Sequence, residues 1–320
     1  MRAIVITENG GPEVLVPAER PDPEPGPGEV LIDVAAAGVN FIDVYYRTGA
    51  YAHDLPYTPG IEAAGTVAAV GDGVGEFSVG DRVASSDVKG GYAAKALVAA
   101  DRLVPVPDAV GLEDAAASML QGMTAHYLTR STYPIKEGDT VLVHAAAGGM
   151  GLLLTQAAKA LGARVIGTAS TPEKEKLAKD AGADVTMGYD GFADRVRELT
   201  GGEGVAAVYD GVGAPTFEGS LASLRLRGTL ALYGAAGGKV PPFDPQRLNP
   251  AGSLFLTRPM LAHHVVTRDE LLERATDVLR WVETGDVRIR VGHRYDLAEA
   301  GAAHADLEAR RTTGKLLLIP

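Results

Sequence analysis

The 320-residue chain contains no cysteine. Disulfides, thiolate nucleophiles, iron–sulfur clusters and zinc sites with thiolate ligands are therefore excluded. Long apolar runs are also missing, and none approaches the roughly 20 residues needed to cross a bilayer. The apolar start reaches Glu8 too soon for the hydrophobic region of a signal peptide. We therefore expect a cytoplasmic protein.

Basic residues are scarce relative to acidic ones: 30 Lys and Arg stand against 41 Asp and Glu, a formal net charge of -11. Such a chain repels phosphate backbones and anionic membranes overall, although a single cleft can still be basic. With 46% hydrophobic and 22% charged residues, the composition is that of a globular protein. At about 100–200 residues per domain, the length suffices for two domains.

The first third of the chain is typical of β-structure. The start, residues 1–8, is expected to form a first strand, and short β-suited runs separated by Gly and Pro predict strands at 14–16, 30–35, 65–70, 82–84 and 92–98. An Ala-rich helix is expected from residue 111 to about 129. Glu113 and Asp114 lie in its first turn, where the helix dipole favours acidic residues.

From residue 139 strands and helices alternate. Strands are expected at 140–144, 164–168, 184–187, 206–210 and 228–233, with helices beginning near 149, 172, 191 and 215. This alternation with apolar strands indicates a parallel sheet covered on both faces.

The tail begins with a capping box, Thr267 with Glu270, that predicts a helix to about 283. A strand at 291–295, a helix at 297–310 and a strand at 315–319 follow. Periodicity alone leaves open whether this tail rejoins the first domain.

The segment 141–151 is an apolar strand, a small-residue turn and a helix start. The glycine positions of the dinucleotide-binding fingerprint fall on Ala146, Gly148 and Gly151, so one of the three glycines is replaced. Gly148 lets backbone N–H groups approach a pyrophosphate at the positive helix end, and Gly151 lets the helix pack closely on the strand. A turn of this kind can serve packing alone. The apolar elements on both sides and the further βα units favour dinucleotide binding.

The next strand distinguishes NAD from NADP. An NAD site usually has an acid about 20 residues past the glycines, whereas the segment 167–171 contains none and Lys174 lies one turn further on. A hydroxyl from Ser170 with this cation suits a 2′-phosphate. Alternatively, Ser170 or Thr171 caps the helix that Pro172 opens and Lys174 is solvated, and both interpretations can hold together. We expect NADPH.

Several ordered motifs resemble the medium-chain dehydrogenase/reductase superfamily, most closely its zinc-free quinone oxidoreductase (zeta-crystallin) branch. The resemblance extends over essentially the whole chain, to 314–320. The motifs are Gly10-Gly11-Pro12-Glu13-Val14-Leu15, Asn40-Phe41-Ile42-Asp43, Gly80-Asp81-Arg82-Val83, Ala145-Ala146-Ala147-Gly148-Gly149 and Tyr209-Asp210-Gly211-Val212-Gly213.

The resemblance implies an α/β fold in which a Rossmann domain with a doubly wound parallel sheet, residues 121–260, is inserted into a GroES-like β-barrel domain, residues 1–120 and 261–320. It implies NADPH in the cleft between the domains and a homodimer built through the Rossmann domains. The implied activity is zinc-independent, NADPH-dependent reduction of a quinone.

The resemblance also implies cofactor-binding residues. Near the nicotinamide these are Asn40, Phe41, Tyr45, Thr124, Tyr233, Gly234, Thr257 and Arg258; at the pyrophosphate, Gly148, Gly149, Met150 and Gly151; around the 2′-phosphate, Ser170, Lys174, Tyr189 and Arg310. Arg310 could instead be an exposed helix end that interacts with the helix dipole.

Zinc-dependent members carry a Cys and a Gly-His-Glu segment, but the corresponding stretches here, 37–40 and 60–62, contain neither Cys nor His. A catalytic zinc needs three protein ligands. The one adjacent histidine pair, His263 and His264, is too close in sequence to hold one metal easily and is interpreted as loop or surface. We expect no metal.

Hydride transfer needs mainly placement of the reactants. The reduced oxygens of a quinone can take protons from solvent, so no general acid is obligatory, and the sequence shows no Ser-Tyr-Lys or His relay. Asn40, Tyr45 and Tyr51 are the candidates to position or hydrogen-bond the acceptor, although Tyr51 could equally be a partly buried loop aromatic.

Two other functions stay open. The same hydride geometry serves an enoyl or alkenal (C=C) reductase that uses NADPH. A different class is a non-catalytic NADPH-binding protein, crystallin-like or RNA-binding. The net charge and the lack of a basic stripe weigh against RNA.

Overall fold

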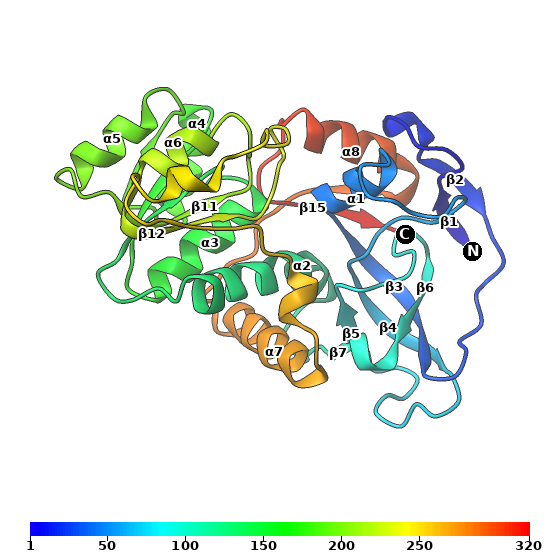
Figure 1. Ribbon diagram of the computed structural model, residues 1–320. Coiled ribbons are helices and arrows are strands. Elements are labelled where there is room, and N and C mark those ends of the chain that lie inside the picture. Colours follow the sequence, from blue (N-terminus) through cyan, green and yellow to red (C-terminus); the bar gives the residue numbers. More distant parts are fainter. The chain divides into compact units, whose positions relative to one another are not determined.

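The computed structural model describes all 320 residues, which form two compact units (Figure 1). Unit 1 comprises Met1–Met123 and Val265–Pro320, and unit 2 comprises Thr124–His264. The domain boundaries expected from the sequence fall at 120/121 and 260/261. Each unit has its own apolar core and is described separately.

Unit 1 is built on a mostly antiparallel sheet with the strand order β14-β15-β3-β4-β5-β7, and β6 pairs with β3. A two-stranded sheet, β1-β2, accompanies it. The strands are β1 (Arg2–Val5), β2 (Val16–Glu19), β3 (Glu29–Val39), β4 (Ala63–Val70), β5 (Arg82–Ser85), β6 (Lys95–Ala99), β7 (Val104–Pro105), β14 (Val291–Asp296) and β15 (Lys315–Ile319).

The C-terminal tail rejoins the first part of the chain, which answers the question that periodicity left open. β15 pairs antiparallel with β3, Leu317 opposite Gly38, and Figure 1 shows these strands side by side. The helices of unit 1 are α1 (Phe41–Arg47), α2 (Leu112–Tyr127, whose last turn enters unit 2), α7 (Arg268–Thr284) and α8 (Ala300–Glu308), with short 3₁₀ helices at Pro12–Val14, Ala100–Arg102 and Leu297–Glu299.

Unit 2 contains a parallel sheet of six strands in the order β10-β9-β8-β11-β12-β13. The strands are β8 (Thr140–Val143), β9 (Arg164–Thr168), β10 (Val185–Met187), β11 (Val205–Asp210), β12 (Leu224–Leu232) and β13 (Phe255–Thr257); the helices are α3 (Gly149–Ala160), α4 (Pro172–Asp180), α5 (Phe192–Leu199) and α6 (Phe217–Ala222), with shorter helical turns at Leu128–Thr132, Pro245–Leu248 and Leu261–His264.

The order of this sheet locates its binding edge. The chain runs outward from β8 through β9 to β10 on one side, and through β11 and β12 to β13 on the other. The carboxyl end of β8 is therefore the topological switch point, where ligands bind in open parallel sheets. Buried apolar side chains such as Leu142, Ile166, Val208 and Leu230 fill the core of the unit.

Several local expectations differ from the structure. Residues 14–16 are not a strand: Pro12–Val14 form a 3₁₀ turn and β2 begins at Val16. The helix α1 lies in a stretch that was expected to be purely β-rich, and the strand expected at 92–98 begins only at Lys95. The proline at position 12 explains the first difference, because it favours the start of a helical turn and cannot donate to a strand ladder.

Candidate functional site

The glycine turn lies at the switch point, between β8 and α3. Gly148 is the N-cap of α3, with an extended backbone (φ -75°, ψ 168°) and no side-chain cap. The first bond of the helix is donated by the Leu152 N–H to Gly148 O at 2.9 Å. The N–H groups of Gly149, Met150 and Gly151 therefore have no partner within the helix, a geometry that suits the binding of an anion.

Gly151 is required by close packing. A Cβ at this position would lie 2.2 Å from Ala145 O and 2.6 Å from Ala146 Cα. Ala145 itself has a left-handed backbone, with φ of +50°. Its N–H donates to the Tyr189 hydroxyl at 3.1 Å, so Tyr189 lies against the turn.

The segment after β9 contains two of the four residues predicted at the 2′-phosphate, Ser170 and Lys174. Thr171 is the N-cap of α4, and its hydroxyl accepts the Lys174 N–H at 3.3 Å. Thr171 thus takes the capping role, while the Ser170 side chain is exposed and Lys174 is half-buried. Arg310 follows α8 in unit 1, exposed and with φ of +55°, which is the helix-end position named as its alternative.

The remaining residues of unit 2 that are predicted near the nicotinamide lie on or after β12 and β13, and on α2. The Tyr233 ring covers Gly211, where a Cβ would lie 2.8 Å from three of its atoms, and Gly234 follows directly. Thr257 ends β13, with exposed Arg258 next to it. Thr124 is half-buried on α2.

The buried Asp210 organises the turn after β11. Its carboxylate accepts the N–H groups of Val212 and Gly213 at 2.8 and 3.0 Å, and the hydroxyls of Thr216 and Ser220 at 2.8 Å each. These bonds explain the Asp210–Gly213 motif as a fixed turn at the binding edge.

A histidine network adjoins this carboxylate. His144 Nδ1 lies 2.8 Å from Thr168 Oγ1, and its Nε2 lies 2.9 Å from Ser220 Oγ. Burial lowers the pKa of His144 to about 4, so the ring is neutral at pH 7. The network is fully buried, and the expectation that no Ser-Tyr-Lys or His relay serves the acceptor stays a prediction. The network joins residues far apart in sequence, which no local motif signals.

In unit 1, α1 begins at the candidate residue Asn40. Its main-chain N–H donates to Asp43 Oδ2 at 2.9 Å, which caps the helix. An Asn followed three residues later by an acid is a helix-start signal that could have predicted α1. Tyr45 on α1 and Tyr51 after it have ring centroids 5.3 Å apart, so the two candidate tyrosines contact one another.

The Asn40 side chain is held in a buried cluster. Its Nδ2 donates to Glu62 Oε2 at 2.8 Å, and its Oδ1 accepts from Lys315 Nζ at 2.6 Å. Lys315 also forms an ion pair with Glu62 at 2.6 Å. No local signal in the sequence marks either partner: Glu62 lies in the stretch 60–62 that lacks metal ligands, and Lys315 lies in the C-terminal motif 314–320.

A second buried chain of hydrogen bonds begins at Asp43. Tyr92 Oη donates to Asp43 Oδ2 at 3.1 Å and lies 3.0 Å from His304 Nε2. His304 Nδ1 lies 3.2 Å from Arg47 Nη1, and Arg47 pairs with Glu308 at 2.9 Å. An arginine can only donate, so Nδ1 accepts and the neutral ring donates from Nε2 to Tyr92.

Burial dominates the protonation of this chain. It raises the pKa of Asp43 to about 7 against the hydrogen bonds from Asn40 and Tyr92. Burial, together with the Arg47 charge, lowers the pKa of His304 to about 3. His304 is therefore neutral at pH 7, whereas Asp43 titrates close to neutrality.

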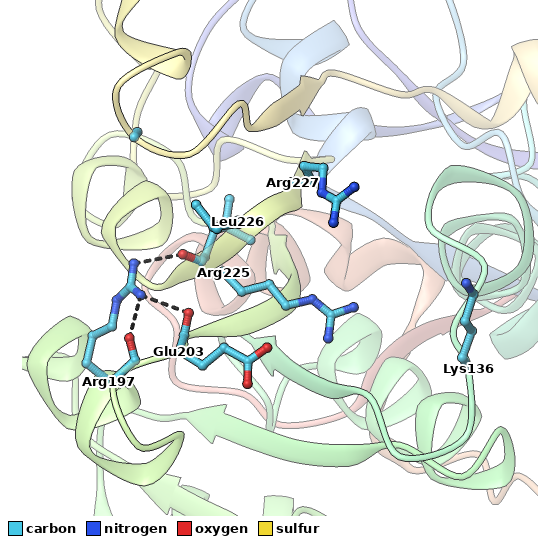
Figure 2. Close-up of a pocket in the computed structure, with 9 residues that line it drawn as sticks. Lys136, Arg197, Glu203, Arg225, Leu226 and Arg227 are labelled. Atoms are coloured by element: carbon cyan, nitrogen blue, oxygen red, sulfur yellow. Dashed lines mark hydrogen bonds between the residues drawn. The ribbon is translucent and has the colours of Figure 1, made fainter.

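The opposite, amino edge of the unit 2 sheet carries a basic pocket. Figure 2 shows Arg225, Arg227 and Lys136 around it. Arg197 is occupied by the carbonyls of Ala222, Gly202, Glu203 and Leu224. A dinucleotide is not expected here, because parallel sheets bind ligands at their carboxyl edge.

No group of three or more His, Cys, Asp or Glu side chains is arranged to hold a metal ion. His264 is not a plain loop residue: it ends a short 3₁₀ helix and stacks on Tyr127, with centroids 4.1 Å apart. None of the helices combines the length and the apolar character that a bilayer crossing requires.

Two family models match the chain. Residues 26–108 match the alcohol dehydrogenase GroES-like domain, and residues 149–280 match the zinc-binding dehydrogenase model. The second description names zinc, yet the chain has no cysteine and no group of side chains suited to a metal. Together with the sheet order of unit 2, these matches confirm the predicted fold class, a Rossmann domain with a GroES-like domain.

Known proteins are similar to the chain over its full length. A quinone oxidoreductase of Pseudomonas aeruginosa is 47% identical over 100% of this chain and 99% of its own. A 2-haloacrylate reductase of a Burkholderia species is 43% identical, covering 99% and 98%. A solved mycobacterial protein complexed with NADPH is 56% identical, with a TM-score of 0.98 and both chains fully covered. The chain is an oxidoreductase that belongs to the zinc-free quinone oxidoreductase family of the medium-chain dehydrogenase/reductase superfamily.

Proposed function

We propose that this chain is an NADPH-dependent quinone reductase that works without a metal. The observation that carries the proposal is the start of α3 at the switch point, which lacks a side-chain cap and whose Gly149–Gly151 N–H groups have no partner within the helix. A structural neighbour at 56% identity is complexed with NADPH, which supports the same cofactor here.

The residues present fit this cofactor. Gly148, Gly149, Met150 and Gly151 would hold the pyrophosphate, and Ser170, Lys174, Tyr189 and Arg310 the 2′-phosphate. The nicotinamide end would meet Asn40, Phe41, Tyr45, Thr124, Tyr233, Gly234, Thr257 and Arg258. When bound, NADPH supplies a hydride, and the protein supplies placement and exclusion of water.

The reaction balances as quinone, NADPH and one proton giving hydroquinone and NADP⁺. Tyr45 and Tyr51, whose rings touch, would orient the acceptor. Asn40 would act differently from the sequence-based expectation. Its Nδ2 already donates to Glu62 Oε2 and Gly38 O, and its Oδ1 accepts from Lys315 Nζ and Gln121 Nε2. A bond to the acceptor would therefore require exchange of an internal one.

A second candidate is reduction of a conjugated C=C bond. It is favoured by one relative, the Burkholderia 2-haloacrylate reductase, at 43% identity. An anaerobic screen of NADPH oxidation against quinones, 2-alkenals, 2-haloacrylates and aldehydes separates the two. Faster turnover of a C=C substrate with negligible quinone reduction would overturn our first choice in favour of the second.

A homodimer through unit 2 is part of the proposal. The edge strand β13 has one unpaired side, Phe255 on it is 61% exposed and Leu226 is 75% exposed. Unpaired edges and apolar patches are features that a partner chain covers. Light scattering that finds only monomers of the chain would contradict it. The cytoplasmic location stays a prediction.

A further inference from the structure

Lys315, Glu62 and Asn40 form a closed triangle of hydrogen bonds inside unit 1. Lys315 Nζ lies 2.6 Å from both Asn40 Oδ1 and Glu62 Oε2, and Asn40 Nδ2 donates to Glu62 Oε2 at 2.8 Å. The exposed fractions are 2% for Lys315, 0% for Glu62 and 3% for Asn40. The three residues lie at the start of β15, just before β4 and just after β3.

The fold around the triangle accommodates the carboxylate specifically. Glu62 Oε1 accepts the main-chain N–H of Leu120 at 2.6 Å. At Gly38, a Cβ would lie 2.2 Å from Glu62 Oε2, so only glycine leaves room for it. A buried ion pair is weak evidence for stability, because apolar residues of similar volume often stabilise a fold equally well. The pair therefore calls for another role.

The triangle determines the orientation of the Asn40 amide. The ammonium requires an acceptor and the carboxylate requires a donor, so Oδ1 must face Lys315 and Nδ2 must face Glu62. Asn40 Nδ2 also donates to Gly38 O, and Asn40 Oδ1 also accepts from Gln121 Nε2, each at 3.3 Å. The amide thus has partners for both donors and both lone pairs. Asn40 is also the residue from which α1 begins, and α1 carries Phe41 and Tyr45.

We propose that Lys315, neutralised by Glu62, is a positioning residue for acceptor reduction: its ammonium fixes Asn40 and thereby the start of α1. The stretches 37–40 and 60–62, which correspond in position to the metal-binding stretches of zinc-dependent relatives but lack their Cys and His, here meet at an ammonium ion. This inference rests on the proposed function, because the side chains it positions are the proposed acceptor and nicotinamide contacts.

The test compares removal of one charge with removal of both. Lys315→Met leaves Glu62 buried without a counter-ion and is expected to lower Tm. The double variant Lys315→Met/Glu62→Gln removes that charge and is expected to recover most of the Tm. Lys315→Arg keeps the cation. Lys95→Met, which breaks an exposed 2.5 Å pair with Asp33 on the same sheet, is the matched control.

In the double variant we expect kcat for quinone reduction to stay about 10-fold or more below the wild type, since misplacement by an ångström can cost that much. The NADPH Kd should change by less than about 2-fold, and amide exchange in 41–47 should become faster. Lys315→Arg should retain part of the wild-type kcat that the double variant loses. The control variant Lys95→Met should match the wild type.

Recovery of kcat together with Tm in the double variant, or unchanged amide exchange in α1, would overturn the positioning role. The kinetic comparison uses whichever acceptor class the wild type reduces. A wild type that reduces C=C bonds but not quinones would therefore refute the proposed function. The Lys315 inference would then be decided by the ratio of the double-variant kcat to the wild-type kcat with a C=C substrate. If the wild type reduces no acceptor, amide exchange in α1 of the double variant decides the inference alone.

Discussion

His304 and Arg47 are 257 residues apart in the chain, yet His304 Nδ1 accepts a hydrogen bond from Arg47 Nη1 at 3.2 Å in the core of unit 1. The bond ties α8 to α1. Tyr92 occupies the other ring nitrogen, so the imidazole joins the C-terminal segment to the helix that carries the proposed contact residues. This relationship makes α1 dependent on the last part of the chain.

Replacing His304 by Ala should destabilise the protein. Tyr92 Oη and Arg47 Nη1 would both lose a buried partner, and a void would remain, at a combined cost of about 2–4 kcal/mol. Urea unfolding measures the change. His293→Ala, at an exposed histidine on β14, is the control and should cost less than about 0.5 kcal/mol. Equal effects of the two substitutions would contradict the account.

Stability should fall on acidification below about pH 6.5. His304 and His144, with folded pKa values of about 3 and about 4, stay neutral while the unfolded chain protonates both. Asp43, raised to about 7, works in the opposite direction, because the folded state binds its proton first. From these three groups the unfolded state binds up to about one proton more, which gives a slope of about 1.2 kcal/mol per pH unit near pH 5 that becomes shallower toward pH 6.

The variant Asp43→Asn removes the proton binding by Asp43 that opposes the effect of the two histidines. It keeps an oxygen for Asn40 N–H and Tyr92 but cannot titrate, so the slope over the same pH window should steepen toward about two protons. Urea midpoints at several pH values provide the measurement. A slope that is unchanged or shallower would show that Asp43 is ionised in the folded protein throughout the window.

Gly151→Ala tests the close contact of α3 with the glycine turn. Its Cβ would lie 2.2 Å from Ala145 O, so the helix start must shift and the N–H groups lose their alignment. We expect the NADPH Kd to rise about 10-fold or more. Gly188→Ala is the matched control, because its Cβ would enter open space. Fluorescence titration that finds wild-type affinity in Gly151→Ala would refute the geometry.

Lys174→Glu tests the proposed contact with the 2′-phosphate. A carboxylate at this half-buried position repels the phosphate, so the NADPH Kd should rise about 10-fold or more while the NADH Kd changes by less than about 2-fold. Lys176→Glu, two residues on and paired with Asp180 on the exposed face, should affect neither. Equal losses for both cofactors would exclude a role of Lys174 in selecting the phosphate.

Metal independence is tested by chelation. Since no group of side chains is suited to a metal, prolonged incubation with 1,10-phenanthroline followed by dialysis should leave quinone turnover within experimental error. Loss of activity that added zinc restores would overturn this prediction.

The sequence alone determined the features that depend on neighbours in the chain. The apolar strand, the spacing of Gly148 and Gly151 and the helix that follows predict the dinucleotide turn, because each element is encoded within about ten residues. The alternation after residue 139 predicts the parallel sheet in the same way. The capping box of Thr267 and Glu270 is confirmed, since a cap is a local hydrogen-bond pattern.

Only the tertiary structure decided which polar residues are buried and what they contact. Lys315 lies 275 residues from Asn40 and 253 from Glu62, and nothing in its surroundings in the sequence distinguishes it from a solvated lysine. The pairing of β15 with β3 brings it inside. A buried charge then needs a partner, because desolvation is costly, but which partner is available depends on the packing of distant strands. For the same reason the sequence indicated Asn40 as an acceptor contact, whereas the fold engages its amide with Lys315 and Glu62.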